Sequence, residues 1–275
     1  MQTIPLLLSF LSAASATKLL LPLYVYPTKE GAAWKPVYEA IDGNPDLEFQ
    51  VILNCNNGPG GDTPGYNNDW QQAVGLLNAY HNVQTLGYVY TSYGARATDD
   101  VVTDILNWAN WNTEEKNDLT VDGIFFDQVP AGWDGDGGPN DLPYMANITD
   151  WARSAFAAID GSQVIYNLGT VSNHPEYFDG TLADVVLVDE TQASDFDPTQ
   201  MALVIPEGKA ARTSWLLYDF ARAGLDSDTL EEWLGAFVEA GVDSVNILDY
   251  DYNHATTVDN PAALGMVAEI LTNLQ

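Results

Sequence analysis

Basic residues are the scarcest class in this chain of 275 residues. Nine lysines and arginines stand against 39 aspartates and glutamates, so the net charge at pH 7 is −30. A polyanion of this kind is repelled by phosphate backbones and by anionic lipid surfaces. We therefore expect neither nucleic acid nor membrane as a partner. Composition leaves open whether the acidity serves only solubility or also attracts a cationic polymer.

Cysteine and histidine are individually rarer still. The single cysteine, Cys55, cannot form an internal disulfide, so burial of apolar side chains must stabilise the fold. The three histidines, at positions 81, 174 and 254, lack the spacing of a zinc motif. The chain also lacks a Gly-X-Ser-X-Gly elbow and a phosphate-binding glycine-rich loop followed by lysine. We therefore expect no metal and no cofactor, and a mechanism other than that of a serine hydrolase.

Long hydrophobic runs are absent, and the longest candidate for a targeting signal is residues 6–14. This run is far shorter than the ~20 residues of a membrane span. Small residues at Ala14 and Ala16 fit the −3 and −1 positions of a signal peptidase site. The sequence thus predicts a signal peptide over residues 1–16 and a secreted, extracellular or wall-associated protein. A frayed cytosolic N-terminus is the alternative, because no positive charge precedes the run. Asn147, in the only sequon, is the predicted glycosylation site.

Eight short apolar runs rich in β-branched and aromatic residues recur along the chain, at 19–26, 49–54, 85–90, 122–127, 163–167, 184–190, 214–218 and 244–248. Helical patterns cover about residues 32–42, 67–81, 98–115, 144–160, 226–240 and 260–274, and the connection around 198–204 is poorly helical. Strands that alternate with helices predict a parallel sheet. Eight such units predict a single (β/α)₈ barrel over residues 17–275, with a doubly wound open sheet as the alternative.

In such a barrel, function collects at the carboxyl ends of the strands. The residues at these ends are polar or aromatic: Tyr24, Tyr26, Asn54, Tyr88, Tyr90, Asp127, Asn167, Glu190, Tyr218 and Asp249. Sugars present apolar ring faces and hydroxyl groups, so this set predicts a carbohydrate site. Asp127 and Glu190 both follow buried runs and could form the carboxylate pair that cleaves a glycosidic bond. Alternatively, one or both only cap a loop or pair with an arginine.

Two neighbouring features bear on this pair. Asp189 directly precedes Glu190, and only one of the two can point into the barrel in a regular strand. Tyr93 and Arg96 follow the third run, where Arg96 could orient a catalytic carboxylate and lower its pKa. The alternative is a surface arginine that begins the next helix.

Four segments, at 22–27, 51–60, 87–96 and 121–127, together resemble the spherulin-4-like proteins. They read PLYVYP, VILN with NGPG, GYVYT with YGAR, and VDGIFFD. The resemblance implies a (β/α)₈ barrel and a secreted glycoside hydrolase that acts on α-1,4-linked N-acetylgalactosamine in the exopolysaccharide galactosaminogalactan. It also implies carboxylates at Asp127, at the following position and at Glu190. That polymer is partly deacetylated and cationic, a partner that the negative charge could attract.

Gln128 departs from the family, which has glutamate at this position. An amide cannot act as general acid, base or nucleophile, so Gln128 can only support the site by hydrogen bonding. Asp127 and Glu190 still supply the two carboxyls of a retaining mechanism, and we assign Asp127 as nucleophile and Glu190 as acid/base, an order that could be exchanged. A non-catalytic sugar-binding barrel and a structural spore-coat or wall protein are the alternatives. We expect a monomer.

Overall fold

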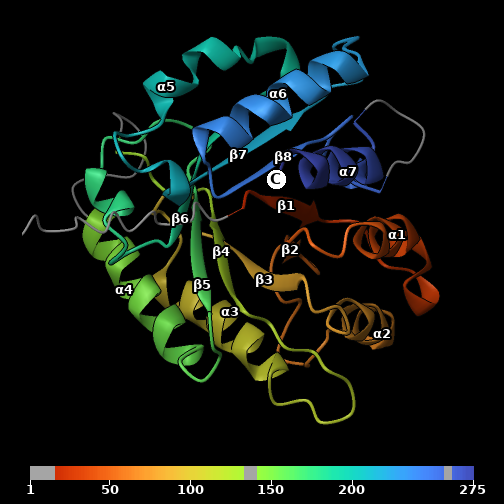
Figure 1. Cartoon of the computed structure of the whole chain (residues 1–275). Helices are drawn as coiled ribbons and strands as arrows, with labels where there is room; N and C mark the ends of the chain where they lie inside the picture. Colours follow the sequence, from red (N-terminus) through yellow and green to blue (C-terminus); the bar gives the residue numbers. More distant parts are fainter. Residues whose placement is uncertain (1–15, 133–140, 257–261) are drawn as a thin grey trace, which may run out of the picture.

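The computed structural model describes residues 16–132, 141–256 and 262–275. Eight parallel strands close into a barrel in sequential order (Figure 1). They are β1 Lys18–Leu23, β2 Phe49–Leu53, β3 Val83–Tyr90, β4 Gly123–Asp127, β5 Gln163–Asn167, β6 Val185–Gln192, β7 Thr213–Tyr218 and β8 Ser244–Ile247. The predicted (β/α)₈ barrel is confirmed, and the open sheet is excluded because β1 also pairs with β8. The predicted signal peptide lies outside the described residues except for Ala16.

Helices surround the barrel, and each predicted helix is present with altered ends. They are α1 Lys35–Gly43, α2 Asn68–Leu77, α3 Thr98–Trp111, α4 Asp141–Ala155, α6 Ser227–Ala240 and α7 Leu264–Leu274. Helix α3 ends earlier than predicted because Asn112 turns the chain back toward β4. Its side-chain amide donates to the carbonyl of Val121 at 3.1 Å and accepts from the Val121 N–H at 2.7 Å. No described helix is long and apolar enough to cross a membrane.

The connections on either side of β6 are mostly short 3₁₀ turns. They are η2 Pro175–Phe178, η3 Ala193–Asp195, η4 Pro198–Gln200 and η5 Ala210–Arg212, with the four-residue helix α5 Met201–Val204 among them. The expectation of a poorly helical connection around 198–204 is therefore confirmed. A further 3₁₀ turn, η1 Lys29–Trp34, precedes α1, and η6 Tyr252–His254 follows β8.

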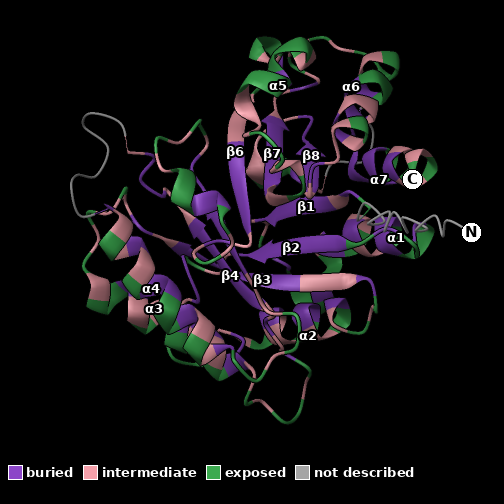
Figure 2. Ribbon diagram, turned by 60° about the vertical axis from the view of Figure 1, so that its left-hand side comes forward, coloured by how far each residue is buried: buried purple, intermediate pink, exposed green. Residues whose placement is uncertain are grey.

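The core fills the barrel and the space between strands and helices (Figure 2). Five tryptophans are fully buried there: Trp34, Trp70, Trp108, Trp111 and Trp215. Gly87 on β3 is required by one of them, since a Cβ at this position would lie 2.6 Å from the Trp108 ring. The indole nitrogen of Trp108 donates to the backbone carbonyl of Tyr88 at 2.9 Å. The core thereby fixes the backbone at the end of β3, where a predicted site residue lies.

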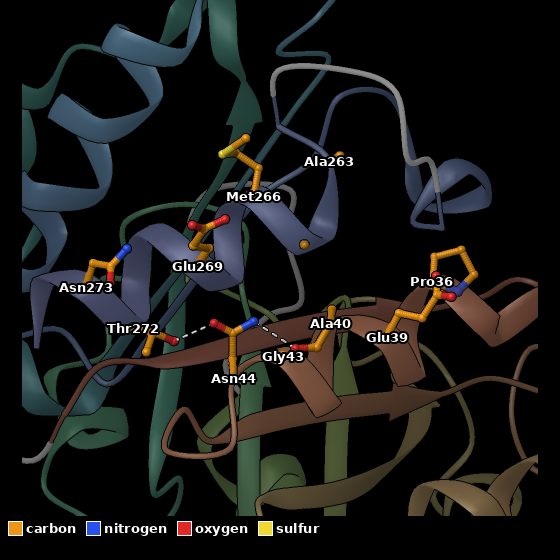
Figure 3. A pocket seen from close by; sticks show the side chains of 11 residues that line it. Pro36, Glu39, Ala40, Gly43, Asn44, Ala263, Met266, Glu269, Thr272 and Asn273 are labelled. Atoms are coloured by element: carbon orange, nitrogen blue, oxygen red, sulfur yellow. Dashed lines mark hydrogen bonds between the residues drawn. The ribbon is translucent and has the colours of Figure 1, made fainter.

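A groove of about 590 Å³ lies outside the barrel between α1 and α7 (Figure 3). Glu39, Met266 and Glu269 are among its lining residues, and none of the described lining residues is aromatic. The side chain of Asn44 in this groove already has protein partners. Its oxygen accepts a hydrogen bond from Thr272 at 2.8 Å, and its nitrogen donates to the carbonyl of Ala40 at 2.8 Å. The groove therefore offers no ring for a sugar to stack on, in contrast to the carboxyl ends of the strands.

Candidate active site at the barrel mouth

The two predicted catalytic acids meet at the barrel mouth through Asn167. Asp127 ends β4, Asn167 ends the neighbouring β5, and Glu190 lies on β6. The amide nitrogen of Asn167 donates to Oδ1 of Asp127 at 2.7 Å and to Oε2 of Glu190 at 2.6 Å. These two oxygens are therefore at most about 5.3 Å apart, which is shorter than the separation of about 6.5–9.5 Å between the carboxyl groups of inverting glycosidases.

Two tyrosine hydroxyls occupy the remaining oxygens of the pair. Tyr88 on β3 donates to Oδ2 of Asp127 at 2.6 Å, and Tyr252 on η6 donates to Oε1 of Glu190. The ring of Tyr24 packs against both, at 5.5 Å from Tyr88 and 5.8 Å from Tyr252. The acids are thus held in a hydrogen-bonded chain that runs from β3 through β5 to the loop after β8.

Tyr252 is the residue that sequence reasoning missed. It lies three residues after Asp249, the residue predicted at the end of the last strand. Its position as an aromatic residue shortly after β8 was the available signal, the same signal that selected Tyr24 and Tyr26 after β1. The ring of Tyr218 packs against Tyr252 at 6.1 Å, so Tyr218 supports this hydroxyl.

The pKa values of both acids are raised above their usual range, and burial is the main cause. Burial raises the pKa of Asp127, and hydrogen bonds from Tyr88, the Gln128 backbone N–H and Asn167 oppose the rise. Burial also raises the pKa of Glu190, hydrogen bonds from Tyr252 and Asn167 oppose it, and the charge of Asp127 raises it further. Hydrogen bonds thus stabilise the ionised forms of both acids. The negative charge of Asp127 acts on Glu190 in the direction that favours a protonated Glu190.

A β-bulge decides which acid of the Asp189–Glu190 pair points inward. The register of β6 against β7 shifts between Leu187 and Asp189. Before the shift, Leu187 pairs with Ser214, and after it Asp189 pairs with Trp215 and Glu190 with Leu216. The extra residue reverses the alternation of the strand beyond this point.

The direction of each side chain follows from Trp215. Its ring packs against Phe237 of α6 at 5.4 Å, so Trp215 and its register partner Asp189 point toward the helices. Glu190 is the next residue and points into the mouth, where it lines the cavity. A regular strand continued from Leu187 would have turned Asp189 inward instead. Burial and the neighbouring charge of Glu190 raise the pKa of Asp189 to about 6.

The cavity at the mouth has a volume of about 320 Å³ and is lined by Tyr93, Asp127, Gln128, Asn167, Leu168, Gly169 and Glu190. Gln128 and Tyr93 both have left-handed backbone conformations, with φ of 54° and 53°. The N–H of Tyr93 donates to the carbonyl of Gln128 at 2.7 Å, which joins the two segments. Such conformations cost about 1–3 kcal/mol each and gather at functional sites. Among the described residues, the side-chain amide of Gln128 has no hydrogen-bond partner, so it is available to a ligand.

Arg96 does not contact the carboxylate pair, so its predicted role in orienting a catalytic acid is wrong. Its guanidinium donates to Asp104 of α3 at 2.6 Å and to the carbonyl of Tyr90 at 3.1 Å. It also lies over the Tyr90 ring, 4.2 Å from the centroid. Arg96 therefore forms its ion pair with Asp104 and not with Asp127 or Glu190. Arg96 and Tyr90 therefore stabilise the start of α3, and the Arg96 side chain is only 14% exposed, so it is not the surface arginine of the alternative interpretation either.

The remaining predicted substrate-binding residues differ in how far their side chains are exposed to solvent. Asp249 is 4% exposed and accepts from the backbone N–H of Ala262 at 2.9 Å, so it holds the chain after β8, and its assignment as a substrate contact stays a prediction. The side-chain oxygen of Asn54 accepts from the Gly58 N–H at 2.9 Å and shapes the loop after β2. In contrast, Tyr26 and Tyr93 are 46% and 49% exposed. These two rings are the most exposed of the predicted aromatic ligands.

Two further expectations concern metal and glycan. Across the described residues, no group of three or more His, Cys, Asp or Glu side chains could hold a metal ion. Asn147 is exposed on α4, while Thr149 of the same sequon is buried and bonded to the Tyr166 hydroxyl. Glycosylation at Asn147 stays a prediction.

Comparison with known proteins places these features in a family. The sequence model of "Spherulation-specific family 4" matches residues 18–262, well beyond the four resembling segments, the last of which ends at residue 127. Spherulin-4 of Physarum polycephalum is 33% identical over 159 residues, which are 58% of this chain and 41% of that protein. The chain thus matches less than half the length of this relative.

Solved structures agree with the fold. The crystal structure of Aspergillus clavatus Sph3 in complex with GalNAc, the monosaccharide N-acetylgalactosamine, is 25% identical with a TM-score of 0.78. The match covers 94% of this chain and 98% of that one. A β-1,4-mannanase from the sea hare Aplysia kurodai is 9% identical with a TM-score of 0.50 and covers 90% and 95% of the two chains, a likeness of fold alone.

Proposed function

The chain belongs to spherulation-specific family 4, and from this premise we propose that it is a retaining glycoside hydrolase. The observation that carries the proposal is the pair Asp127 and Glu190, whose oxygens are held by one nitrogen of Asn167 closer together than the carboxyl groups of inverting enzymes. Both acids line a cavity at the barrel mouth, where (β/α)₈ enzymes have their active sites.

In the proposed reaction, Asp127 attacks the anomeric carbon while Glu190 donates a proton to the glycosidic oxygen. The bond to the leaving sugar breaks and a covalent ester with Asp127 forms. Glu190 then takes a proton from the water that hydrolyses this ester. Asp127 suits the first role because Tyr88, Asn167 and the Gln128 N–H stabilise its ionised form. Glu190 suits the second because burial and the charge of Asp127 favour its protonated form.

The proposed substrate is an α-1,4-linked polymer of N-acetylgalactosamine and galactosamine. We propose that the protein is secreted and cleaves bonds within this polymer outside the cell. The likeness to Sph3, which was crystallised with GalNAc, supports this sugar. In an α-linked 2-acetamido sugar the acetamide lies on the same face as the leaving group, so it cannot displace that group from behind. A carboxylate of the protein is then needed, and Asp127 supplies it. The net charge of −30 suits a polymer with cationic amines.

Incubation with α-1,4-linked N-acetylgalactosamine and galactosamine oligomers tests the proposal. We expect shorter products and new reducing ends from the wild-type protein. Asp127→Asn should abolish them, a loss of at least about 10³-fold in kcat/KM. Asp189→Asn is the matched control, because it changes the adjacent acid that faces the helices and should keep most of the activity. Full activity of Asp127→Asn would disprove the assignment.

Gln128 favours one second candidate, a sugar-binding barrel without catalysis. Its amide lines the cavity beside Asp127 and cannot transfer a proton. This candidate predicts saturable binding of the oligomers with no rise in reducing ends. Gln128→Glu would then create activity, whereas under the leading proposal the wild-type protein is already active.

A further inference from the structure

Tyr26 presents a fixed aromatic ring to solvent at the rim of the barrel mouth. It is 46% exposed, yet its hydroxyl is held at both hydrogen-bonding positions. The hydroxyl donates to Oδ2 of Asp69 at 2.7 Å and accepts from the side-chain nitrogen of Asn67 at 3.3 Å. Asn67 is itself fixed, because its oxygen caps α2 by accepting from the N–H groups of Asp69 and Trp70. The ring therefore cannot rotate freely.

Two buried tryptophans support this ring from below. Trp70 meets Tyr26 edge-on at 6.4 Å, and Trp34 meets Trp70 edge-on at 5.2 Å. Trp34 is anchored by its indole nitrogen, which donates to the carbonyl of Val25 at 2.7 Å. Both tryptophans are fully buried, so the space into which Tyr26 could collapse is filled. One side of the Tyr26 ring is thus supported by the core, and the ring stays 46% exposed to solvent.

The ring of Tyr26 lies outside the catalytic cavity, on the segment that follows Tyr24. Tyr26 is not among the residues that line the cavity. It follows Tyr24 by two residues, so the Cα atoms of the two tyrosines are at most about 7 Å apart. Tyr24 packs against Tyr88 and Tyr252, the two tyrosines that bond to the catalytic acids. The aromatic cluster beside the acids and the exposed ring of Tyr26 therefore belong to the same short segment that follows β1.

The size of the cavity makes a second contact area necessary for a polymer. Its volume of about 320 Å³ is at the lower end of the range for pockets that hold a small ligand. Most of a sugar chain must then lie across the surrounding rim. An exposed ring face beside a carboxylate suits a sugar, because the ring stacks on the apolar face and Asp69 accepts from a hydroxyl.

We propose that Tyr26 and Asp69 form a distal subsite for another unit of the same glycan chain. The inference rests on the proposed glycosidase function and specifies its substrate as a chain long enough to span both areas. Sugars in the cavity alone gain nothing from Tyr26. Only oligomers that also reach the rim are bound by it.

The test is a chain-length series of N-acetylgalactosamine oligomers, with kcat/KM measured for each length. Tyr26→Ala should lower kcat/KM about tenfold for long oligomers and leave the shortest cleaved oligomer unchanged. Tyr26→Phe keeps the ring and should keep most of the effect of length. Trp151→Ala is the matched control, because Trp151 is equally exposed at 46% but lies on α4. It should behave as wild type at all lengths.

Two results would overturn the subsite. An equal loss at every length would show that Tyr26 acts on the cavity or on stability, and no loss at any length would show that the ring binds nothing. Failure of the proposed function can be told apart from these by binding measurements. If no oligomer is cleaved, binding of the same series is measured by calorimetric titration. The affinity of the wild-type protein should rise with oligomer length, and that of Tyr26→Ala should not.

Discussion

Asp127 and Glu190, on strands that are not neighbours, accept hydrogen bonds from the same nitrogen atom of Asn167 on the strand between them. This nitrogen sets the spacing of the two acids and stabilises the ionised form of both. The amide is therefore a positioning residue for the whole pair. Its buried oxygen has no hydrogen-bond partner among the described residues, so the orientation is maintained by the two bonds from the nitrogen.

Replacement of Asn167 by alanine should impair the pair as a unit. The pKa values of Asp127 and Glu190, already raised by burial, should rise further because a donor is lost. Since the nucleophile must be ionised, the acidic limb of the pH profile should move to higher pH, and kcat should fall by about 10²-fold. A pH–rate series on oligomer hydrolysis measures both. A loss of activity with an unmoved acidic limb would contradict this role.

Replacement of Tyr252 by phenylalanine should act on Glu190 alone. The ring and its packing on Tyr24 remain, but the hydrogen bond that lowers the pKa of Glu190 is lost. The pKa of Glu190 should rise, and because this acid must be protonated to act, the basic limb should move to higher pH. Tyr38→Phe, which removes a hydroxyl bonded to the Ala73 carbonyl far from the mouth, is the control and should leave the profile in place.

Asp189 should make stability depend on pH. Its pKa in the folded protein is raised to about 6, above that of an unfolded aspartate, so its contribution is favourable at low pH and is lost as pH rises through about 6. Asp189→Asn should therefore stabilise the protein near pH 7 by about 1 kcal/mol, a value reduced for partial solvent exposure, and have little effect near pH 4. Urea unfolding at the two pH values measures the difference. Equal effects at both would count against this origin.

Gly87 should tolerate no side chain. A Cβ there would lie 2.6 Å from the Trp108 ring, so Gly87→Ala should cost about 1–3 kcal/mol in unfolding free energy. Activity should fall as well, because Trp108 fixes the backbone of Tyr88. Gly235→Ala is the matched control on α6, where a Cβ meets no atom within 4 Å, and it should stabilise the protein by up to about 1 kcal/mol. Thermal unfolding of both variants decides between these outcomes.

The barrel could be predicted because its signals are local. Apolar runs that alternate with helical patterns, and polar or aromatic residues at the ends of the runs, are visible in a short window of sequence. The positions of Asp127, Asn167 and Glu190 at neighbouring strand ends followed from this count. The helix ends were less accurate, because a contact such as that of Asn112 with Val121 links residues that no local pattern connects.

Site residues that depend on distant partners were harder to predict. Arg96 was placed near the right strand, but its choice of Asp104 over a catalytic acid depends on how α3 packs. Tyr252 reaches Glu190 across 62 positions of sequence, a pairing that only closure of the barrel creates. The bulge in β6 needs the pairing of β6 with β7 before it can be seen.

The sequence by itself determined the kind of fold, the two acids at the strand ends and the absence of a glutamate at position 128, because each depends on residue type and periodicity. Only the tertiary structure decided that one nitrogen of Asn167 joins the acids, that Glu190 and not Asp189 faces the mouth, and that Tyr252 completes the site. These relations depend on register and distance between strands far apart in the chain, and no local pattern of residues carries that information.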